Sequence, residues 1–241
     1  MTPAQRTVLA QERSIRRIIT AGLLLAITLL LVFSRLGMIP VPTPAANATI
    51  AHIPAIVAGI LEGPVVGFVV GLGFGFASFS AATIPMFKDP LVAILPRLFI
   101  GITAAYTAIA LRKASKPVLN ALLAVLLVLA LVFAYEVARS TLWLGIVVAV
   151  VAVAGAIAMA LWMRQEDVRI VGLAIAAAVG SLTNTALVLS AAVWRGYIPA
   201  AAAWGIGVTH GIPEVIVSAV VTVAVVAALR QIGGRRRGSR L

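Results

Sequence analysis

The feature that most limits the fold of this chain is a series of apolar blocks, most of them long enough to cross a bilayer, separated by short polar turns. A helix needs about 20 predominantly apolar residues to span the hydrocarbon core. Hydrophobic residues make up 62% of the 241 residues, and the mean hydropathy is +1.13, well above a water-soluble domain. We therefore expect an all-α polytopic membrane protein. The candidate helices are 15–36, 50–61, 64–84, 90–111, 118–137, 142–163, 170–194 and 207–229.

The second block, 50–61, is shorter than a bilayer span. It is either a tilted helix that begins near a proline or a re-entrant segment. Gly63 and Pro64 follow it after Glu62, and a proline at this point ends the helix. We expect a tight hairpin there, which leads into the third block.

The placement of Lys and Arg predicts the topology, because cations near short loops are retained on the cytoplasmic side. Eight crossings with both termini cytoplasmic put fourteen cations inside and four outside, and leave Arg97 within a helix. The inside cations are Arg6, Arg13, Arg16, Arg17, Arg112, Lys113, Lys116, Arg164, Arg169, Arg230, Arg235, Arg236, Arg237 and Arg240; the outside ones are Arg35, Lys88, Arg139 and Arg195.

The net charge of +12 does not indicate a nucleic-acid partner, because the cations flank membrane helices and no basic patch is interleaved with aromatic residues. We interpret them as retention charges that also attract anionic lipid. Residues 1–241 are therefore expected to form a single integral membrane domain, with 230–241 as a basic cytoplasmic tail. The early apolar run is about a full span long, so we do not expect cleavage as a signal peptide.

Enzymatic chemistry is nearly absent from the sequence, which has seven acidic residues, two histidines and no cysteine. The G-x-S-x-G, H-E-x-x-H and G-x-x-x-x-G-K-[ST] motifs are also missing. We expect no catalytic residue, no metal site and no cofactor, and any ATP hydrolysis must come from another protein.

Small residues recur at helical spacing in two blocks. Gly67, Gly71 and Gly75 lie on one face of the third block, and Gly22 and Ala26 repeat the spacing in the first. Such stripes let a neighbouring backbone approach closely, either within the chain or in another subunit. Both alternatives remain open from the sequence.

Polar residues inside the apolar blocks are the best functional candidates, because burying them in a membrane is costly. Arg97 lies about 10 Å below the outer boundary at the rise of an α-helix. It either pairs with an internal acid such as Glu214 or binds a ligand. His210 lies one turn before Glu214, and Asn184 and His52 approach the same side of the membrane. We expect a pocket that opens outward, although His52 or a threonine beside Asn184 could merely satisfy the backbone.

Two outer loops are bounded by prolines and carry a few polar groups. They span residues 40–47, which end at Asn47, and residues 85–90, which include Lys88. Such segments suit semi-rigid lids, and ordinary connecting loops are the alternative.

Several short segments, taken in their order along the chain, resemble the substrate-binding (S) components of energy-coupling factor (ECF) vitamin transporters. They are NATIAHIPAI (47–56), LEGPVVG (61–67), FG with Ser78 (74–78), FKDP (87–90), PRLFIG (96–101), GSLTNT (180–185) and GIPEV (211–215). The resemblance covers all but the termini and about 116–163. Because this family has six helices, it implies a core of 15–111 and 170–229 with an inserted helical hairpin at 117–163.

The resemblance also implies a function. The chain would capture a vitamin-like solute outside a prokaryotic plasma membrane and present it to a membrane coupling (T) subunit and two ATPase subunits. The segments ATIAHIP (48–54), GSLTNT (180–185) and GIPE (211–214) look most like the pantothenate branch, and a carboxylated substrate would suit Arg97. The expected docking face is Gly22 and Ala26, with Gly67, Gly71 and Gly75. The expected substrate-binding residues are Asn47, His52, Lys88, Arg97, Asn184, His210 and Glu214.

Two other classes of function remain open. An autonomous ion-coupled carrier would use Arg97, His210 and Glu214 as a charge relay. A membrane enzyme with His210 and Glu214 as acid and base is the weaker alternative, because two residues without a nucleophile or a metal do not define a reaction.

Overall fold

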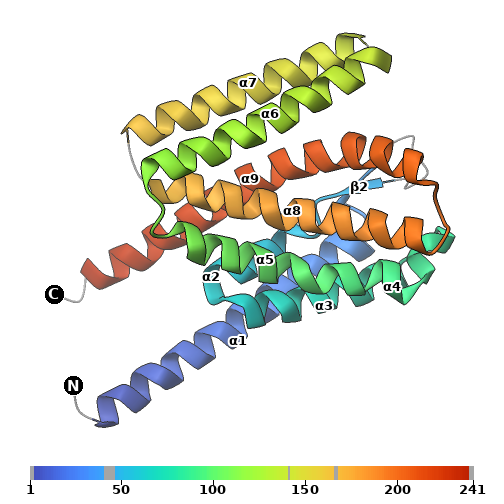
Figure 1. The fold of residues 1–241 in the computed structure, drawn as a ribbon. Helices are drawn as coiled ribbons and strands as arrows, with labels where there is room; N and C mark the ends of the chain where they lie inside the picture. Colours follow the sequence, from blue (N-terminus) through green and yellow to red (C-terminus); the bar gives the residue numbers. More distant parts are fainter. Residues whose placement is uncertain (1–2, 41–46, 141, 166–167, 239–241) are drawn as a thin grey trace.

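The computed structural model describes residues 3–40, 47–140, 142–165 and 168–238, and it is almost entirely helical (Figure 1). The elements are α1 (Pro3–Phe33), β1 (Met38–Pro40), β2 (Asn47–Thr49), α2 (Ile53–Glu62), α3 (Pro64–Ser80), the 3₁₀ turn η1 (Pro85–Lys88), α4 (Pro90–Ala93), α5 (Leu95–Leu111), α6 (Lys116–Ser140), α7 (Leu142–Gln165), α8 (Val168–Trp194) and α9 (Ala200–Gly238).

Prolines mark the starts of the helices on the path from α2 to α5. Pro54, Pro64, Pro90 and Pro96 each occupy one of the first positions of a helix, where the missing N–H costs no hydrogen bond. Gly63 joins α2 to α3 with a φ of +99°, a conformation that favours glycine. The tight hairpin predicted at this point is therefore confirmed.

Some boundaries differ from those predicted. The block 90–111 is broken at Ile94 into α4 and α5, and α9 begins at Ala200 instead of 207. Residues 230–238 continue α9 as a helix, and 239–241 lie outside the described residues. The basic cytoplasmic tail at 230–241 stays a prediction. The hydrophobic pattern locates only the membrane-compatible part of a helix, whereas the backbone hydrogen bonds continue through polar residues.

Four of the described helices are long and apolar enough to cross a membrane: Ser14–Phe33, Pro90–Leu111, Ile170–Trp194 and Ala200–Leu229. The apolar helices Ile53–Glu62, Pro64–Ser80, Lys116–Val132 and Gly145–Ile157 are shorter. The all-α membrane architecture is thus supported, whereas the eight crossings and the division into a six-helix core and an insert stay predictions.

Helix α2 lies at the centre of the bundle. Its residues from Ile53 to Ile60 are all buried, and it packs against α1, α3, α5, α8 and α9. A helix that is apolar on every face is typical of such a position. The short second block is therefore a core helix within the bundle.

The glycine stripe of α3 lies against α5. A Cβ placed on Gly67 would come within 2.8 Å of the backbone of Gly101, and one on Gly71 within 2.3 Å of the carbonyl oxygen of Arg97. Gly75 faces Ile94 at 3.0 Å. Packing within the chain therefore accounts for this stripe, which corrects the expectation that Gly67, Gly71 and Gly75 form a docking surface.

The small residues of α1 have different surroundings. Gly22 and Ala26 are exposed, and a Cβ on Gly22 would meet no atom within 4 Å. The same face carries the exposed side chains of Leu23 and Leu30. This face of α1 is open, so its docking role stays a prediction.

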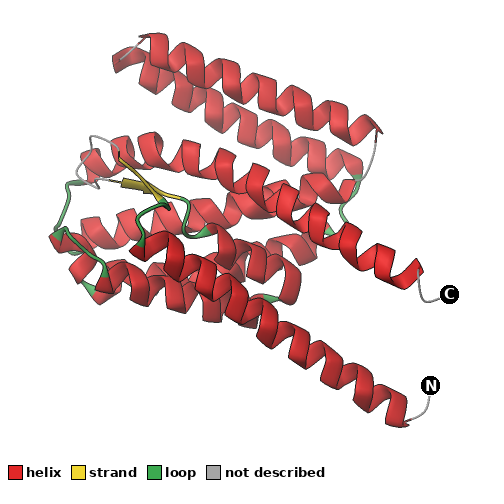
Figure 2. Ribbon diagram, turned by 180° about the vertical axis from the view of Figure 1, so that it is seen from behind, coloured by secondary structure: helices red, strands yellow, loops and turns green. Residues whose placement is uncertain are grey.

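Helices α6 and α7 pack against each other as an antiparallel pair beside the rest of the bundle, as the views from both sides show (Figures 1 and 2). The start of α6 joins the bundle through Leu119, which packs with Val171 and Ile175 of α8. The pair lies on the side of the bundle away from α1.

The loop 40–47, predicted to be a proline-bounded lid, is flanked by a small antiparallel strand pair. Strands β1 and β2 pair Met38 with Thr49 and Pro40 with Asn47, and β2 contacts α9. The connecting residues 41–46 lie outside the described residues. Strand pairing was not predicted, because two strands of three residues leave no periodic signal.

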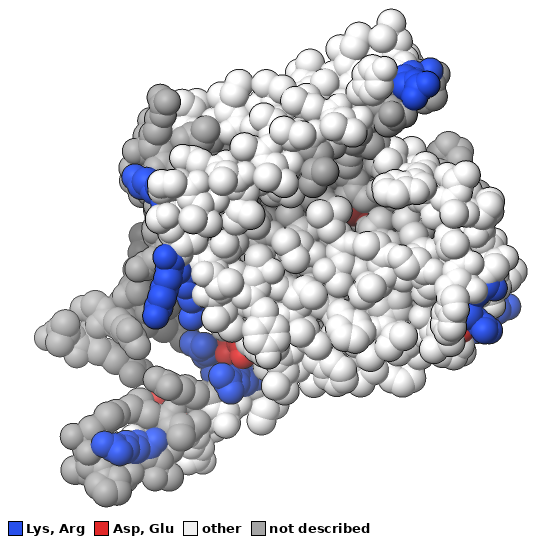
Figure 3. Space-filling model, in the orientation of Figure 1, with Lys and Arg blue, Asp and Glu red and all other residues white. Residues whose placement is uncertain are grey.

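Charged groups lie at the ends of the helices. Figure 3 shows Lys and Arg side chains gathered at two opposite sides of the molecule, with a mostly uncharged surface between them. At one end, Arg16 of α1 contacts Glu62 at 3.2 Å, beside the α2–α3 turn. Helix α1 begins and α9 ends on the same side of the bundle (Figure 1).

Candidate functional site

Arg97 is a buried cation in the first turn of α5, with 4% of its surface exposed. Its Nη1 donates a hydrogen bond to the carbonyl oxygen of Val92 in α4. The guanidinium also lies over two aromatic rings, 5.6 Å from the centroid of Phe74 and 5.1 Å from that of Phe87, distances typical of cation–π contacts. These contacts hold the cation in place without neutralising it.

No carboxylate of the described residues forms an ion pair with Arg97, and its Nε has no hydrogen-bond partner. The direct pair with Glu214 that the sequence left open is therefore not formed. A buried, ionised group normally has a partner of opposite charge. Arg97 thus has donor capacity and charge available for an anion.

Glu214 is buried in α9, and both of its carboxylate oxygens are engaged. Oε1 accepts a hydrogen bond of 2.6 Å from the backbone N–H of Thr49 in β2, and Oε2 accepts one of 3.1 Å from the hydroxyl of Thr185 in α8. Glu214 therefore links the strand pair to α8 and α9. His210 lies buried one turn earlier on α9.

His52 is completely buried at the start of α2. Its Nε2 is 3.1 Å from the hydroxyl of Ser181 in α8 and 2.9 Å from that of Ser218 in α9. Because this nitrogen already contacts two hydroxyl groups inside the core, the observed role of His52 is to join three helices.

Asn184 is a further buried group with an unused polar atom, besides Arg97 (Nε), His52 (Nδ1) and Thr222 (Oγ1). It is 4% exposed, and its Oδ1 has no hydrogen-bond partner. It lies between Ser181 and Thr185 along α8, and these neighbours contact His52 and Glu214 respectively. A buried amide oxygen without a partner is uncommon in folded proteins, so Asn184 is a candidate for contact with a solute.

The buried polar side chains described above lie near one another in the bundle. Arg97 lies within electrostatic range of Glu214 and of His52. No group of three or more His, Asp or Glu side chains in the described parts of the chain is arranged to hold a metal ion. These side chains can therefore offer hydrogen bonds to a solute, and Arg97 can offer a positive charge that no acid of the described residues neutralises.

Two of the predicted site residues, Asn47 and Lys88, are not among the buried polar residues described above. Lys88 is exposed at the end of η1, and Asn47 is half-buried in β2, two residues before Thr49. The structure does not bring Lys88 into contact with the buried polar groups, and Asn47 borders a segment outside the described residues.

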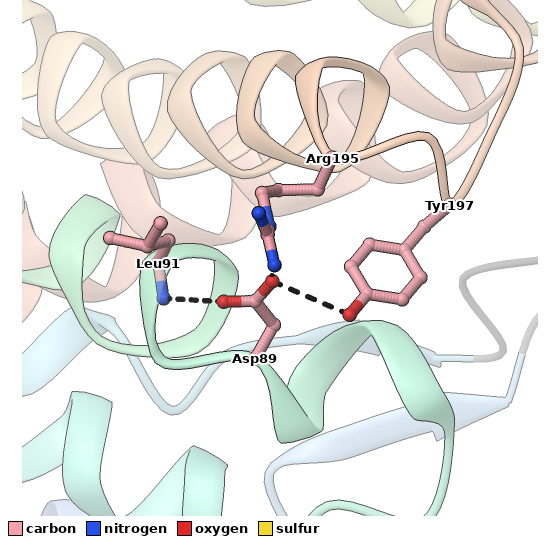
Figure 4. Close-up of polar contacts among 4 residues, drawn as sticks. All are labelled: Asp89, Leu91, Arg195 and Tyr197. Atoms are coloured by element: carbon pink, nitrogen blue, oxygen red, sulfur yellow. Dashed lines mark hydrogen bonds and ion pairs between the residues drawn. The ribbon is translucent and has the colours of Figure 1, made fainter.

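A polar cluster that the sequence did not indicate joins the start of α4 to the turn between α8 and α9 (Figure 4). Asp89 Oδ2 accepts a hydrogen bond of 2.6 Å from Nε of Arg195 and one of 3.3 Å from the hydroxyl of Tyr197. Its Oδ1 caps α4 by accepting from the backbone N–H of Leu91 at 3.0 Å. We call Asp89, Arg195 and Tyr197 the clasp.

Within the clasp, Asp89 and Arg195 form an ion pair. The hydrogen bond from Arg195 holds the pKa of the Asp89 carboxyl below its usual range, and the same contact raises the pKa of Arg195. Asp89 directly before Pro90 is a recognisable helix cap. Its pairing with Arg195, 106 positions away, depends on tertiary structure and could not be found from sequence.

The comparison with known families adds one finding. Residues 16–138, about half of the chain, match the family described as ECF transporter, substrate-specific component. The chain belongs to this family. The matched region of this substrate-specific component runs from α1 to α6 and includes Arg97, His52 and the glycine stripe of α3. No curated protein matched the chain.

Membership confirms the coarser predictions. The chain is a multi-pass membrane protein and a transporter subunit, not a member of an enzyme family. The family works with a membrane T subunit and ATPases and takes a small-molecule substrate. The match also covers most of α6, which the sequence had assigned to the inserted hairpin; the division at 117–163 stays a prediction.

Proposed function

We propose that this substrate-specific component captures a micronutrient that carries an anionic group, with pantothenate as the first candidate. The observation that carries this proposal is the unpaired, buried guanidinium of Arg97. A carboxylate at this position would meet a cation and the free Nε donor, and charge-assisted hydrogen bonds of this kind are about twice as strong as neutral ones.

Asn184 supports a ligand with further polar groups. Its unpartnered Oδ1 can accept a hydrogen bond from a hydroxyl or an amide N–H. Pantothenate combines a carboxylate with hydroxyl and amide groups, so it provides a partner for Nε of Arg97 and for Oδ1 of Asn184. Glu214 would assist by holding β2 and α8 in position through Thr49 and Thr185.

The proposed partners are a membrane coupling subunit and two ATPase subunits in a prokaryotic plasma membrane. The open face of α1 that carries Gly22 and Ala26 is the proposed contact for the coupling subunit, because small residues allow close helix approach. An autonomous carrier that uses Arg97, His210 and Glu214 as a relay is the alternative, and uptake into vesicles without any ATPase would favour it.

The test combines identification and binding. Purified protein in detergent is examined for small molecules that copurify, by mass spectrometry, and labelled pantothenate is titrated against wild type, Arg97→Gln and Arg112→Gln. Arg112 is a matched control, because it is an exposed arginine at the other end of α5.

We expect Arg97→Gln to weaken binding at least about tenfold, since a hydrogen bond to a charged group contributes about 1.5–3 kcal/mol. Arg112→Gln should bind like wild type. Equal affinity in wild type and Arg97→Gln would contradict the proposed role of Arg97, and a different copurifying solute would replace pantothenate as the candidate.

A further inference from the structure

The position of Arg97 depends on the single-turn helix α4, which directly precedes α5. The Nη1 of Arg97 donates to the carbonyl oxygen of Val92, and Val92 belongs to α4. Whatever fixes this turn therefore also fixes the direction in which the guanidinium points.

Asp89 holds this turn with its backbone and its side chain. Its carbonyl oxygen accepts hydrogen bonds from the N–H groups of Val92, at 3.0 Å, and of Ala93, at 2.8 Å. Its Oδ1 caps the N–H of Leu91 at 3.0 Å. Three of the N–H groups at the start of α4–α5 thus depend on one residue, which lies outside the buried polar set.

Asp89 is itself held from the other half of the bundle. Arg195 and Tyr197 come from the turn between α8 and α9 (Figure 4), and these two helices carry Asn184 and Glu214. Val92 also belongs to one buried apolar cluster with Val188 of α8 and Ile206 of α9. The clasp therefore connects the element that orients Arg97 to the elements that present Asn184.

We propose that Asp89 is a positioning residue for solute binding: clasped by Arg195 and Tyr197, it sets the place of Arg97 relative to Asn184. This inference rests on the proposed function, because it takes Arg97 as the anion contact. Without the clasp, α4 is held only by apolar contacts such as those of Val92, so it leaves its place more often and the guanidinium loses its fixed direction. Binding of an anionic group should then suffer more than binding of a neutral analogue.

The substitution that isolates the clasp is Asp89→Asn. Asparagine is as good a helix cap as aspartate, so the bond to Leu91 is retained while the charge that pairs with Arg195 is removed. Arg195→Gln removes the same pair from the other side. Glu62→Gln is the matched control, because Glu62 is also an acid with a side chain 6% exposed that pairs with an exposed arginine, but at the opposite end of the bundle.

The first measurement compares pantothenate with panthenol, in which an alcohol replaces the carboxylate. We expect Asp89→Asn and Arg195→Gln to lower the ratio of pantothenate to panthenol affinity about tenfold, in the direction of Arg97→Gln, and Glu62→Gln to leave it unchanged. A purely structural role for the clasp would reduce both affinities in parallel, and this result would overturn the inference.

The variant Arg97→Gln separates the two proposals. If it lowers the ratio and Asp89→Asn does not, only the positioning role fails. If it leaves the ratio unchanged, the anion contact fails, and the positioning role fails with it.

A second measurement needs no solute. The chain has no cysteine, so Val92→Cys introduces a single thiol at a fully buried position of α4. Its labelling by a maleimide should be at least about tenfold faster in the Asp89→Asn background than with Glu62→Gln or with no further change. Equal labelling rates would overturn the inference, because α4 would then keep its place without the clasp.

Discussion

Gly22 and Gly71 have different surroundings, so the same substitution by alanine should stabilise the protein at Gly22 and destabilise it at Gly71. Replacing a helical glycine by alanine contributes up to about 1 kcal/mol through helix propensity alone. At Gly22 the added methyl group meets nothing within 4 Å, so only this gain remains. At Gly71 it would lie 2.3 Å from the carbonyl oxygen of Arg97.

The cost at Gly71 follows from the distance. Ordinary van der Waals contact needs about 3.5 Å, so α3 and α5 must separate locally by about 1 Å. Overpacking of this kind costs about 1–3 kcal/mol. Because the propensity gain is common to both variants, the difference in stability between Gly71→Ala and Gly22→Ala is the overpacking cost alone.

The assay is thermal unfolding of the purified protein in detergent, followed by the fluorescence of its four tryptophans. For a chain of this size about 1 kcal/mol corresponds to about 2–4 °C in Tm, so Gly71→Ala should melt at least about 2 °C below Gly22→Ala. It should also bind pantothenate more weakly, because the atom displaced belongs to Arg97. Equal melting temperatures would refute the assignment of the α3 stripe to internal packing.

Two further predictions concern the clasp and α1. The ion pair lowers the pKa of Asp89, so its stabilisation is present above the unfolded pKa of about 3.9 and is lost as the pH falls through the lower folded value. The difference in Tm between wild type and Asp89→Asn should therefore be constant from pH 8 to 5 and shrink below about pH 4; a difference that grows on acidification would contradict this. Gly22→Leu should leave solute affinity unchanged and should not lower Tm, but it should reduce copurification with the membrane coupling subunit and uptake. Unchanged assembly would remove α1 from the docking surface.

The sequence predicted the helical membrane architecture well, because apolar blocks and prolines act locally. The hairpin at Gly63 and the start of α4 after Asp89 are visible in the sequence for this reason. The helix ends were less accurate. Polar residues such as those of 3–14 and 230–238 extend α1 and α9 without any hydrophobic signal.

The candidate site was predicted as a set of residues but not as a network. Arg97, Asn184 and Glu214 stand out because polar side chains are rare in apolar blocks, and the structure brings them to one region. The hydrogen bonds from Thr49 and Thr185 to Glu214, and the clasp on Asp89, join residues far apart in sequence. Such pairings are decided by the packing of whole helices, which no local spacing encodes.

The location of the α6–α7 pair affects how the molecule can be altered. It is attached through the first turns of α6 to α8, on the side of the bundle away from the exposed face of α1. A fluorescent label or an affinity handle on this outlying pair would be remote from the surface where the coupling subunit is expected to sit. Transport can thus be followed from one flank of the molecule while the opposite flank keeps its natural surface.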